Sequence, residues 1–225
     1  MDRRLFLWGV LAAGGCTTAA PGSGLLERAV EAAGGRAALD AVKELAWTGE
    51  AAVHFGGQSL ELGVETVVRP FVSAKSVSWP KAQGRAVART LIVGLDGGRA
   101  ITPRGDAPLP EAQLVHERLQ FGLYALMLLP VDSVSEIPPD RLLIAHAGAP
   151  QTEFRFDAAG RMISARNRVP DAEKGARMIA QEIAFEGIIE SNGVRWPKSI
   201  TIRQDDAPYF DLRIATFEAR ATAST

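Results

Sequence analysis

The sequence predicts a mainly β protein with some helix, in which one strongly curved antiparallel sheet forms an unclosed β-barrel of about nine to eleven strands and helices cover its concave face. Apolar and polar residues alternate from Leu45 onward, which is typical of strands with one buried and one solvent-exposed face. Short turns containing Gly, Asn or Asp separate these strands. No strand–helix–strand alternation is visible, which argues against a parallel sheet.

The first 15 residues have the layout of an export signal. Arg3 and Arg4 precede an apolar run, Leu5 to Ala13, and two glycines then lead to Cys16, the only cysteine in the chain. The apolar run is shorter than the roughly 20 residues needed to span a bilayer. We therefore expect residues 1–15 to be a signal peptide that is removed from the mature protein.

Two motifs in this segment indicate how it is processed. Ala12 to Cys16 resembles a bacterial lipobox, which implies cleavage before Cys16 and lipidation of Cys16, for example by palmitate. Arg3 to Leu7 resembles the twin-arginine motif, which implies export of an already folded protein. The alternative is an ordinary signal peptide with a chance cysteine, and the choice between the twin-arginine and the general secretory route stays open.

The mature chain predicts a single domain. Residues 16–24 would form a flexible tether after the lipidated cysteine, residues 25–219 a half-barrel domain, and residues 220–225 a polar tail. Leu25 to Lys43 carries an apolar stripe at helical spacing. Because Gly34 and Gly35 interrupt this stripe, we expect a helix stop followed by a second short helix.

Strands fill the first half of the domain. Leu45 to Phe55 and Leu60 to Val64 predict a hairpin, and residues 71–79, 85–93 and 99–102 continue it. Residues 103–110 are expected to form a loop. Glu111 to Leu129 predicts one helix that is polar at its start and apolar on all sides at its end, so we expect it to be buried on more than one side. Pro130 stops this helix.

Strands resume after a proline-broken linker at residues 131–140. The alternating segments are residues 142–146, 152–156, 161–169, 177–187, 196–202 and 210–214. Asn192-Gly193 is a strong turn signal between two of them.

Composition excludes two classes of protein. Lys and Arg number 25 and Asp and Glu 26, and no basic stripe is present, so we expect no nucleic-acid partner. With a single cysteine the chain cannot form an intramolecular disulfide, so folding depends on a buried core. We expect a monomer.

No motif for catalysis, cofactor binding or metal binding is recognisable. His54, His116 and His146 lie on separate predicted elements without the paired spacing of zinc ligands. No nucleophile elbow, phosphate-binding loop or dinucleotide fingerprint appears. We therefore predict a protein that is not an enzyme and has no catalytic, metal or cofactor residues.

The pattern of the mature chain resembles the LolA/LolB-like periplasmic lipoprotein carriers. The resemblance rests on Ala32 to Gly49, on Thr152 to Gly160, on Gly193 to Ile200 and on Phe210 to Phe217. It implies an unclosed barrel with a helical lid over an apolar cavity that holds the acyl chains of lipoproteins or other lipids. The candidate cavity residues are Trp47, Val53, Phe55, Leu60, Leu62, Val64, Leu91, Val93, Phe154, Phe156, Trp196, Ile200 and Ile202 on the wall, and Phe121, Tyr124, Met127 and Leu128 on the lid. Each of these side chains could equally belong to a filled core.

Three functional hypotheses follow. In the first hypothesis, the protein is a lipoprotein that Cys16 anchors on the periplasmic side of a Gram-negative envelope. It binds an acyl chain, a lipoprotein or another hydrophobic ligand and acts in lipid or lipoprotein trafficking. An Asp directly after the lipidated cysteine would resemble a signal that retains lipoproteins in the inner membrane. Thr17 stands at this position instead, so the outer membrane is favoured. In the second, a structural or interaction lipoprotein has a filled core and no ligand. The third is a hydrolase whose catalytic residues are scattered along the sequence.

Overall fold

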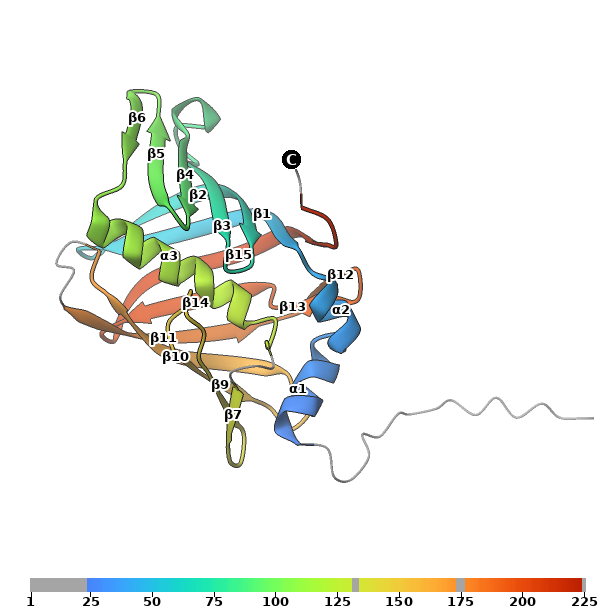
Figure 1. The fold of residues 1–225 in the computed structure, drawn as a ribbon. Coiled ribbons are helices and arrows are strands. Elements are labelled where there is room, and N and C mark those ends of the chain that lie inside the picture. The colour runs from blue at the N-terminus through green and yellow to red at the C-terminus, as the bar shows by residue number, and fades with distance from the viewer. Residues whose placement is uncertain (1–23, 131–133, 173–176, 224–225) are drawn as a thin grey trace, which may run out of the picture.

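The computed structural model describes residues 24–130, 134–172 and 177–223. The expected signal peptide, Cys16 and nearly all of the expected tether lie outside these residues. One antiparallel sheet of thirteen strands dominates the structure, with the order β6-β5-β4-β3-β2-β1-β15-β14-β11-β10-β9-β8-β7. The predicted mainly β architecture with one large antiparallel sheet is confirmed (Figure 1).

The elements follow each other in chain order. The first half contains α1 (Leu25–Ala32), α2 (Arg36–Ala41), β1 (Glu44–Phe55), β2 (Gln58–Arg69), β3 (Ser73–Pro80), the 3-10 turn η1 (Arg85–Val87), β4 (Arg89–Gly94), β5 (Gly97–Thr102), β6 (Gly105–Pro108) and α3 (Glu111–Leu126). The second half contains β7 (Val134–Ile137), β8 (Arg141–Ile144), β9 (Thr152–Phe156), β10 (Met162–Pro170), β11 (Met178–Glu186), β12 (Ile189–Ser191), β13 (Val194–Trp196), β14 (Ser199–Gln204) and β15 (Ala207–Arg220).

The expected strand count was too low. The sheet has thirteen strands, and β12 and β13 form a separate two-stranded ribbon. The two segments expected to be a loop and a linker contain β6 and β7, which are the two edge strands of the sheet. Edge strands tolerate proline because one side of the strand needs no ladder hydrogen bonds, so Pro108 does not prevent β6 from pairing with β5.

The centre of the sheet joins the beginning and the end of the domain. β1 pairs with β2 on one side and with β15 on the other. The β1–β15 register shifts between Thr48 and Gly49, and a Cβ atom on Gly49 would lie 2.2 Å from the carbonyl oxygen of Arg213. A bulge of this kind bends a strand and increases its twist. The sequence therefore places a glycine where β1 and β15 approach closely and curve.

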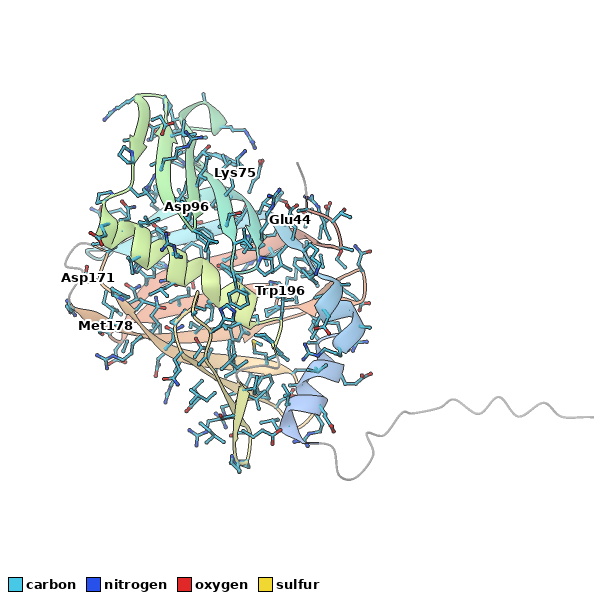
Figure 2. The ribbon with its side chains drawn as sticks, viewed as in Figure 1. Glu44, Lys75, Asp96, Asp171, Met178 and Trp196 are labelled. Atoms are coloured by element: carbon cyan, nitrogen blue, oxygen red, sulfur yellow. The ribbon has the colours of Figure 1, made fainter. Side chains whose placement is uncertain are left out.

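A buried carboxylate with two arginine partners closes the same junction. Glu44, at the start of β1, is fully buried, and its carboxylate accepts a hydrogen bond of 2.6 Å from Arg220 at the end of β15 (Figure 2). Arg69 approaches the other carboxylate oxygen at 3.5 Å. Residues 220–225 were expected to form a polar tail, but Arg220 is the last residue of β15.

The helices take two different positions. α3 crosses the concave face of the sheet, as expected for the central helix (Figure 1). The early helical segment was expected to cover the same face, but α1 and α2 lie at one end of the sheet. α1 buries only Leu25 and Ala29, a stripe too narrow to cover a sheet face. It packs against the β9–β10 turn, where Gly160 lies against the Arg28 carbonyl, and the Ala33 carbonyl accepts a hydrogen bond of 2.9 Å from the Arg195 amide of β13.

The core lies between the helices and the sheet, and most of its aromatic side chains come from the second half of the chain. Phe154 and Phe185 stack with ring centroids 6.4 Å apart, and Trp196 and Phe217 stack at 5.4 Å. Trp196 lies near the C-terminal end of α3, where Met127 and Leu129 are also buried (Figure 2). Tight aromatic packing of this kind fills the concave face under the apolar half of the helix.

Candidate functional site

A cavity of about 170 Å³ lies beneath α3, between the helix and the first half of the sheet. Four helix residues form its roof, and strands β1 to β4, β14 and β15 form its floor. The lining residues are Trp47, Leu62, Val64, Thr66, Ser76, Ser78, Arg89, Leu91, Glu117, Gln120, Phe121, Tyr124, Ile202, Tyr209, Phe210 and Leu212.

The roof comes from one face of α3. Glu117, Gln120, Phe121 and Tyr124 follow each other at the spacing i, i+3, i+4, i+7, which places them on the same side of a helix. The Tyr124 ring packs against Trp47 of β1 with centroids 4.8 Å apart, and Phe121 lies 6.4 Å from Tyr124. The two aromatic side chains therefore close the roof on its C-terminal side, and the polar pair closes it on its N-terminal side.

The floor changes from polar to apolar across the strands. On the β3–β4 side, Ser78 pairs with Arg89, and the Ser76 hydroxyl lies 2.9 Å from that of Thr66 on β2. On the opposite side the register places Ile202 of β14 beside Phe210 of β15. Leu62 and Leu212 lie in one row across β1, because both pair with Ala51. The sheet register thus creates one hydroxyl-rich and one apolar side of the same cavity.

Glu117 is the acidic group of the cavity. Burial raises the pKa of its carboxyl, and the charges of His116 and Arg89 together with a hydrogen bond from Gln113 offset part of this effect. Burial, reinforced by the nearby Glu117 carboxylate, raises the pKa of the Tyr209 hydroxyl to about 12. The same two causes hold the pKa of Tyr124 well above its ordinary value. Both tyrosines are therefore neutral hydrogen-bonding groups at physiological pH.

Part of the predicted cavity set lines this space. The predicted residues that line the cavity are Trp47, Leu62, Val64, Leu91, Phe121, Tyr124 and Ile202. A second group is buried in the core outside the cavity and consists of Val93, Met127, Leu128, Phe154, Phe156, Trp196 and Ile200. Val53, Phe55 and Leu60 lie toward the tip of the β1–β2 hairpin, where Phe55 is 53% exposed and Leu60 38% exposed.

The sequence interpretation missed the polar half of the lining. Glu117 and Gln120 could have been found, because they share the helical face of Phe121 and Tyr124. Ser76 and Ser78 alternate on β3 and so share one face of that strand. Which face is concave depends on the register with β2 and β4, and Arg89 joins the cavity only through that register.

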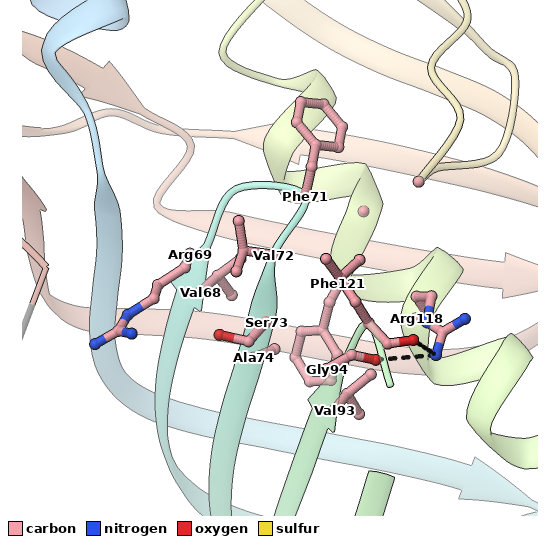
Figure 3. A pocket seen from close by; sticks show the side chains of 13 residues that line it. Val68, Arg69, Phe71, Val72, Ser73, Ala74, Val93, Gly94, Arg118 and Phe121 are labelled. Carbon is pink, nitrogen blue, oxygen red and sulfur yellow. Dashed lines mark hydrogen bonds between the residues drawn. The ribbon is translucent and has the colours of Figure 1, made fainter. Parts of the chain in front are cut away.

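Two smaller cavities lie beside the middle of α3 and just after its C-terminal end. One of about 30 Å³ borders Phe71, Ala74, Val93 and Phe121 (Figure 3). Beside it, Arg118 of α3 donates hydrogen bonds of 2.9 and 3.0 Å to the carbonyl oxygens of Gly94 and Leu95 in the β4–β5 turn (Figure 3). Another, of about 50 Å³, lies below α1 and borders Met127, Phe156 and Trp196. Arg118 therefore attaches α3 to the β4–β5 turn beside the cavity of about 30 Å³.

Two larger depressions lie away from the concave face. One of about 480 Å³ follows the exposed tip of the β1–β2 hairpin around Phe55 and Gly57. The other, of about 320 Å³, is lined by charged residues including Lys75, Arg85 and Glu218. Neither combines burial with an apolar lining, as the cavity beneath α3 does.

The histidines have structural partners and lie apart. His54 is 2.7 Å from an Asp211 carboxylate oxygen, His116 is 2.7 Å from the Pro170 carbonyl oxygen, and His146 stacks on Phe71 at 3.5 Å. Across residues 24–130, 134–172 and 177–223, no group of three or more His, Cys, Asp or Glu side chains could hold a metal ion. Within the same ranges, no helix has both the length and the apolar character to cross a membrane.

Comparison with solved structures identifies the fold. A DUF1329 family protein from Desulfovibrio piger has a TM-score of 0.53 at 9% identity, with 89% of this chain and 93% of that chain covered. A LolA superfamily protein from Nitrosomonas europaea has a TM-score of 0.51 at 11% identity, with 83% of this chain and 94% of that chain covered. No protein-family model and no curated protein matches the sequence. The chain has a LolA-like fold, as the resemblance in the sequence implied.

Proposed function

We propose that this protein is a non-enzymatic binding protein of the bacterial cell envelope that holds an acyl chain or a similar hydrophobic ligand beneath α3. The observation that carries the proposal is the cavity itself, in which Phe121 of α3 faces apolar side chains of several strands, among them Trp47 and Leu212. A pre-formed, mostly apolar cavity with a few polar groups is the usual form of a small-ligand site. The LolA-like fold supports the same class of function.

Movement of α3 is part of the proposed mechanism. The cavity of about 170 Å³ is smaller than the roughly 300–1,000 Å³ typical of ligand pockets. A long acyl chain therefore needs additional space, and the helix is the element that can supply it. The ligand would replace the contacts that Phe121 and Tyr124 make with the sheet, so burial of its chain would offset the loss of those contacts.

A structural or interaction lipoprotein without a ligand is the second candidate. It is favoured by the large buried set outside the cavity, since Phe154, Phe156, Trp196 and Ile200 belong to a filled core. In that case the space beneath α3 would be a packing defect, and no hydrophobic probe would bind there with defined stoichiometry.

Binding of a fluorescent fatty-acid probe to the protein without residues 1–15 distinguishes the two candidates. We expect saturable binding that Leu62→Glu weakens at least tenfold, because the new carboxylate would lie among apolar lining residues. Leu60→Glu is the matched control, since Leu60 precedes Leu62 by two residues on β2 but is 38% exposed and outside the cavity. Equal binding by both variants, or no saturable binding by the parent protein, would exclude this site.

The membrane anchor is a separate part of the proposal. Cys16 would carry the lipid and residues 16–24 would tether the domain to the periplasmic side of the envelope, with the outer membrane favoured. Labelling with palmitate in cells should mark the parent protein and not Cys16→Ala. Replacing Arg3 and Arg4 by Lys tests the export route, because a twin-arginine substrate should then accumulate unprocessed. Equal palmitate labelling of parent and Cys16→Ala would remove the anchor from the proposal without affecting the cavity.

A further inference from the structure

The cavity beneath α3 has a chemically distinct polar side. Ser78 and Arg89 lie opposite each other on β3 and β4, and the hydroxyls of Ser76 and Thr66 continue the polar floor toward β2. Glu117 and Gln120 of α3 form the roof over this side. An acyl chain would offer no hydrogen bond to Ser78 or Arg89 on this side, whereas an amphiphile can bind them with its headgroup.

We propose that Arg89, Ser78 and Glu117 form a headgroup subsite for the carboxyl group of a single-chain amphiphile, whose chain extends toward Ile202, Phe210 and Leu212. This inference rests on the proposed function and adds the chemical class of the ligand. The register supports the direction, because the polar strands β3 and β4 and the apolar strands β14 and β15 lie on opposite sides of β1 and β2.

The positive charge of Arg89 on the cavity floor selects the type of headgroup. Arg89 is exposed at the start of β4 and carries a positive charge that would repel an ammonium headgroup. It would form charge-assisted hydrogen bonds with an acidic headgroup, and these are stronger than the bonds that a neutral ester can accept. Arg89 thus favours an acid over both an amine and an ester.

Glu117 distinguishes a carboxylic acid from a phosphate. Its partly buried carboxyl interacts with Arg89 and His116 and lies near Tyr124 and Tyr209. Two carboxyl groups that share a site can also share one proton, since the environment disfavours ionisation of both. A phosphate with up to two negative charges would meet greater repulsion from the Glu117 carboxylate than a carboxyl group would. A carboxyl group can accept from Arg89 and share a proton with Glu117 at the same time.

The volume supports a single chain. The cavity of about 170 Å³ corresponds to the space of roughly five or six water molecules at about 30 Å³ each. This accommodates a headgroup and the first part of one chain before α3 has to move. A lipid with two or three chains would require displacement of the helix at the outset.

Displacement of the fluorescent probe by ligands of equal chain length tests the subsite. Dodecanoic acid should compete at a concentration at least tenfold lower than methyl dodecanoate, dodecylamine or dodecyl phosphate. The ester cannot form charge-assisted bonds to Arg89, the amine is repelled by Arg89, and the phosphate is repelled by the Glu117 carboxylate. Arg89→Gln should bring the acid to the level of the ester and leave competition by the ester unchanged. Arg85→Gln is the matched control, since Arg85 pairs with Glu65 away from the cavity.

The outcomes separate this inference from the function on which it rests. If the acid and the ester compete equally, or if the phosphate or the amine competes better than the acid, the carboxyl subsite is wrong while the cavity remains a binding site. The same conclusion follows if Arg89→Gln leaves the preference for the acid intact. If no ligand displaces the probe and the probe itself does not saturate, the proposed function fails as well. Ser78→Ala gives a second measure, with a smaller loss for the acid alone.

Discussion

Gly34 allows the turn after α1 to lie directly against the β12–β13 turn. A Cβ atom at this position would lie 1.9 Å from the Gly193 carbonyl oxygen, and the φ angle of Gly34 is +122°. We expect Gly34→Ala to lower the free energy of unfolding by about 3 kcal/mol or more, because the backbone would have to shift as well as hold a strained conformation. Chemical denaturation measures the change.

The control for this substitution is Gly57→Ala. Gly57 has a φ angle of +77°, and a Cβ atom added there would have no neighbour within 4 Å, so the substitution adds only conformational strain. Its expected loss is about 1 kcal/mol. Equal losses at the two glycines would contradict the close approach of the two turns.

Gln181 is a buried amide in the middle of β11. It is 1% exposed, and neither its amide nitrogen nor its oxygen has a hydrogen-bond partner within the part of the chain that the structure describes. We expect Gln181→Leu to raise the free energy of unfolding by about 1–2 kcal/mol, because a buried amide costs more than an apolar side chain of similar size. Thermal and urea unfolding report the difference.

Asn167 provides the comparison for Gln181. It pairs with Gln181 across β10 and β11, but its amide donates a hydrogen bond of 3.3 Å to the Thr152 hydroxyl. Asn167→Leu should therefore gain less stability than Gln181→Leu or lose some. A large loss in Gln181→Leu would instead assign the amide a polar partner in solution.

Arg118 connects α3 to the β4–β5 turn, beside the small cavity that borders Phe71 and Phe121. Its guanidinium donates to the carbonyl oxygens of Gly94 and Leu95 at 2.9 and 3.0 Å (Figure 3). If α3 is a lid, Arg118→Met should favour the open helix, since hydrogen bonds to a charged group contribute about 1.5–3 kcal/mol. Hydrogen exchange of the α3 amides should become about tenfold to a hundredfold faster through local opening.

Arg99→Met controls for the loss of an arginine side chain from the β4–β5 hairpin whose turn Arg118 binds. Arg99 lies on β5, and its exposed side chain pairs with Asp106 of β6 and not with α3. This variant should leave exchange in α3 unchanged. Equal acceleration in both variants, or exchange in the β11 core that rises with that of α3, would indicate global rather than lid opening.

The secondary structure was predictable wherever a local sequence pattern determines it. The alternation of apolar and polar residues located the strands, and the apolar end of Glu111 to Leu129 identified the helix that crosses the concave face. The edge strands β6 and β7 were missed because each contains only four residues and lies beside prolines, so no alternation develops. The position of α1 depends on Gly34, Gly160 and the β12–β13 ribbon, which are distant in sequence, and no local pattern encodes these contacts.

The site was predictable only on its apolar side. A residue such as Leu62 was a candidate because alternation shows which face of a strand is buried. Alternation does not distinguish a residue that lines a cavity from one that fills the core, so Phe154 and Ile200 entered the same prediction although both are fully buried elsewhere. The polar side depends on the register among β2, β3 and β4, which pairs Ser78 with Arg89 and with Val64.

The burial of Glu117 connects the cavity to the stability of the entire domain. Because burial raises the pKa of this carboxyl in the folded state, the folded protein binds more protons than the unfolded chain between the unfolded value of about 4.3 and the raised folded value. The contribution of Glu117 to stability is therefore fully present at acid pH and is lost as the pH rises through that interval. Glu117→Gln removes this dependence, so the melting temperature of the variant relative to the parent should increase between pH 4 and pH 8.

Glu50→Gln gives the opposite sign and serves as the control. Glu50 is an exposed carboxylate whose pKa is lowered by its hydrogen bond and ion pair with Lys81, so its contribution is present at neutral pH and is lost as the pH falls. The melting temperature of Glu50→Gln relative to the parent should therefore decrease slightly, or stay level, over the same range. Thermal unfolding of the three proteins at closely spaced pH values measures both trends. A Glu117→Gln difference that is constant or falls from pH 4 to pH 8 would mean that the carboxyl ionises freely in the folded protein, and proton sharing with a ligand carboxyl would then lose its physical basis.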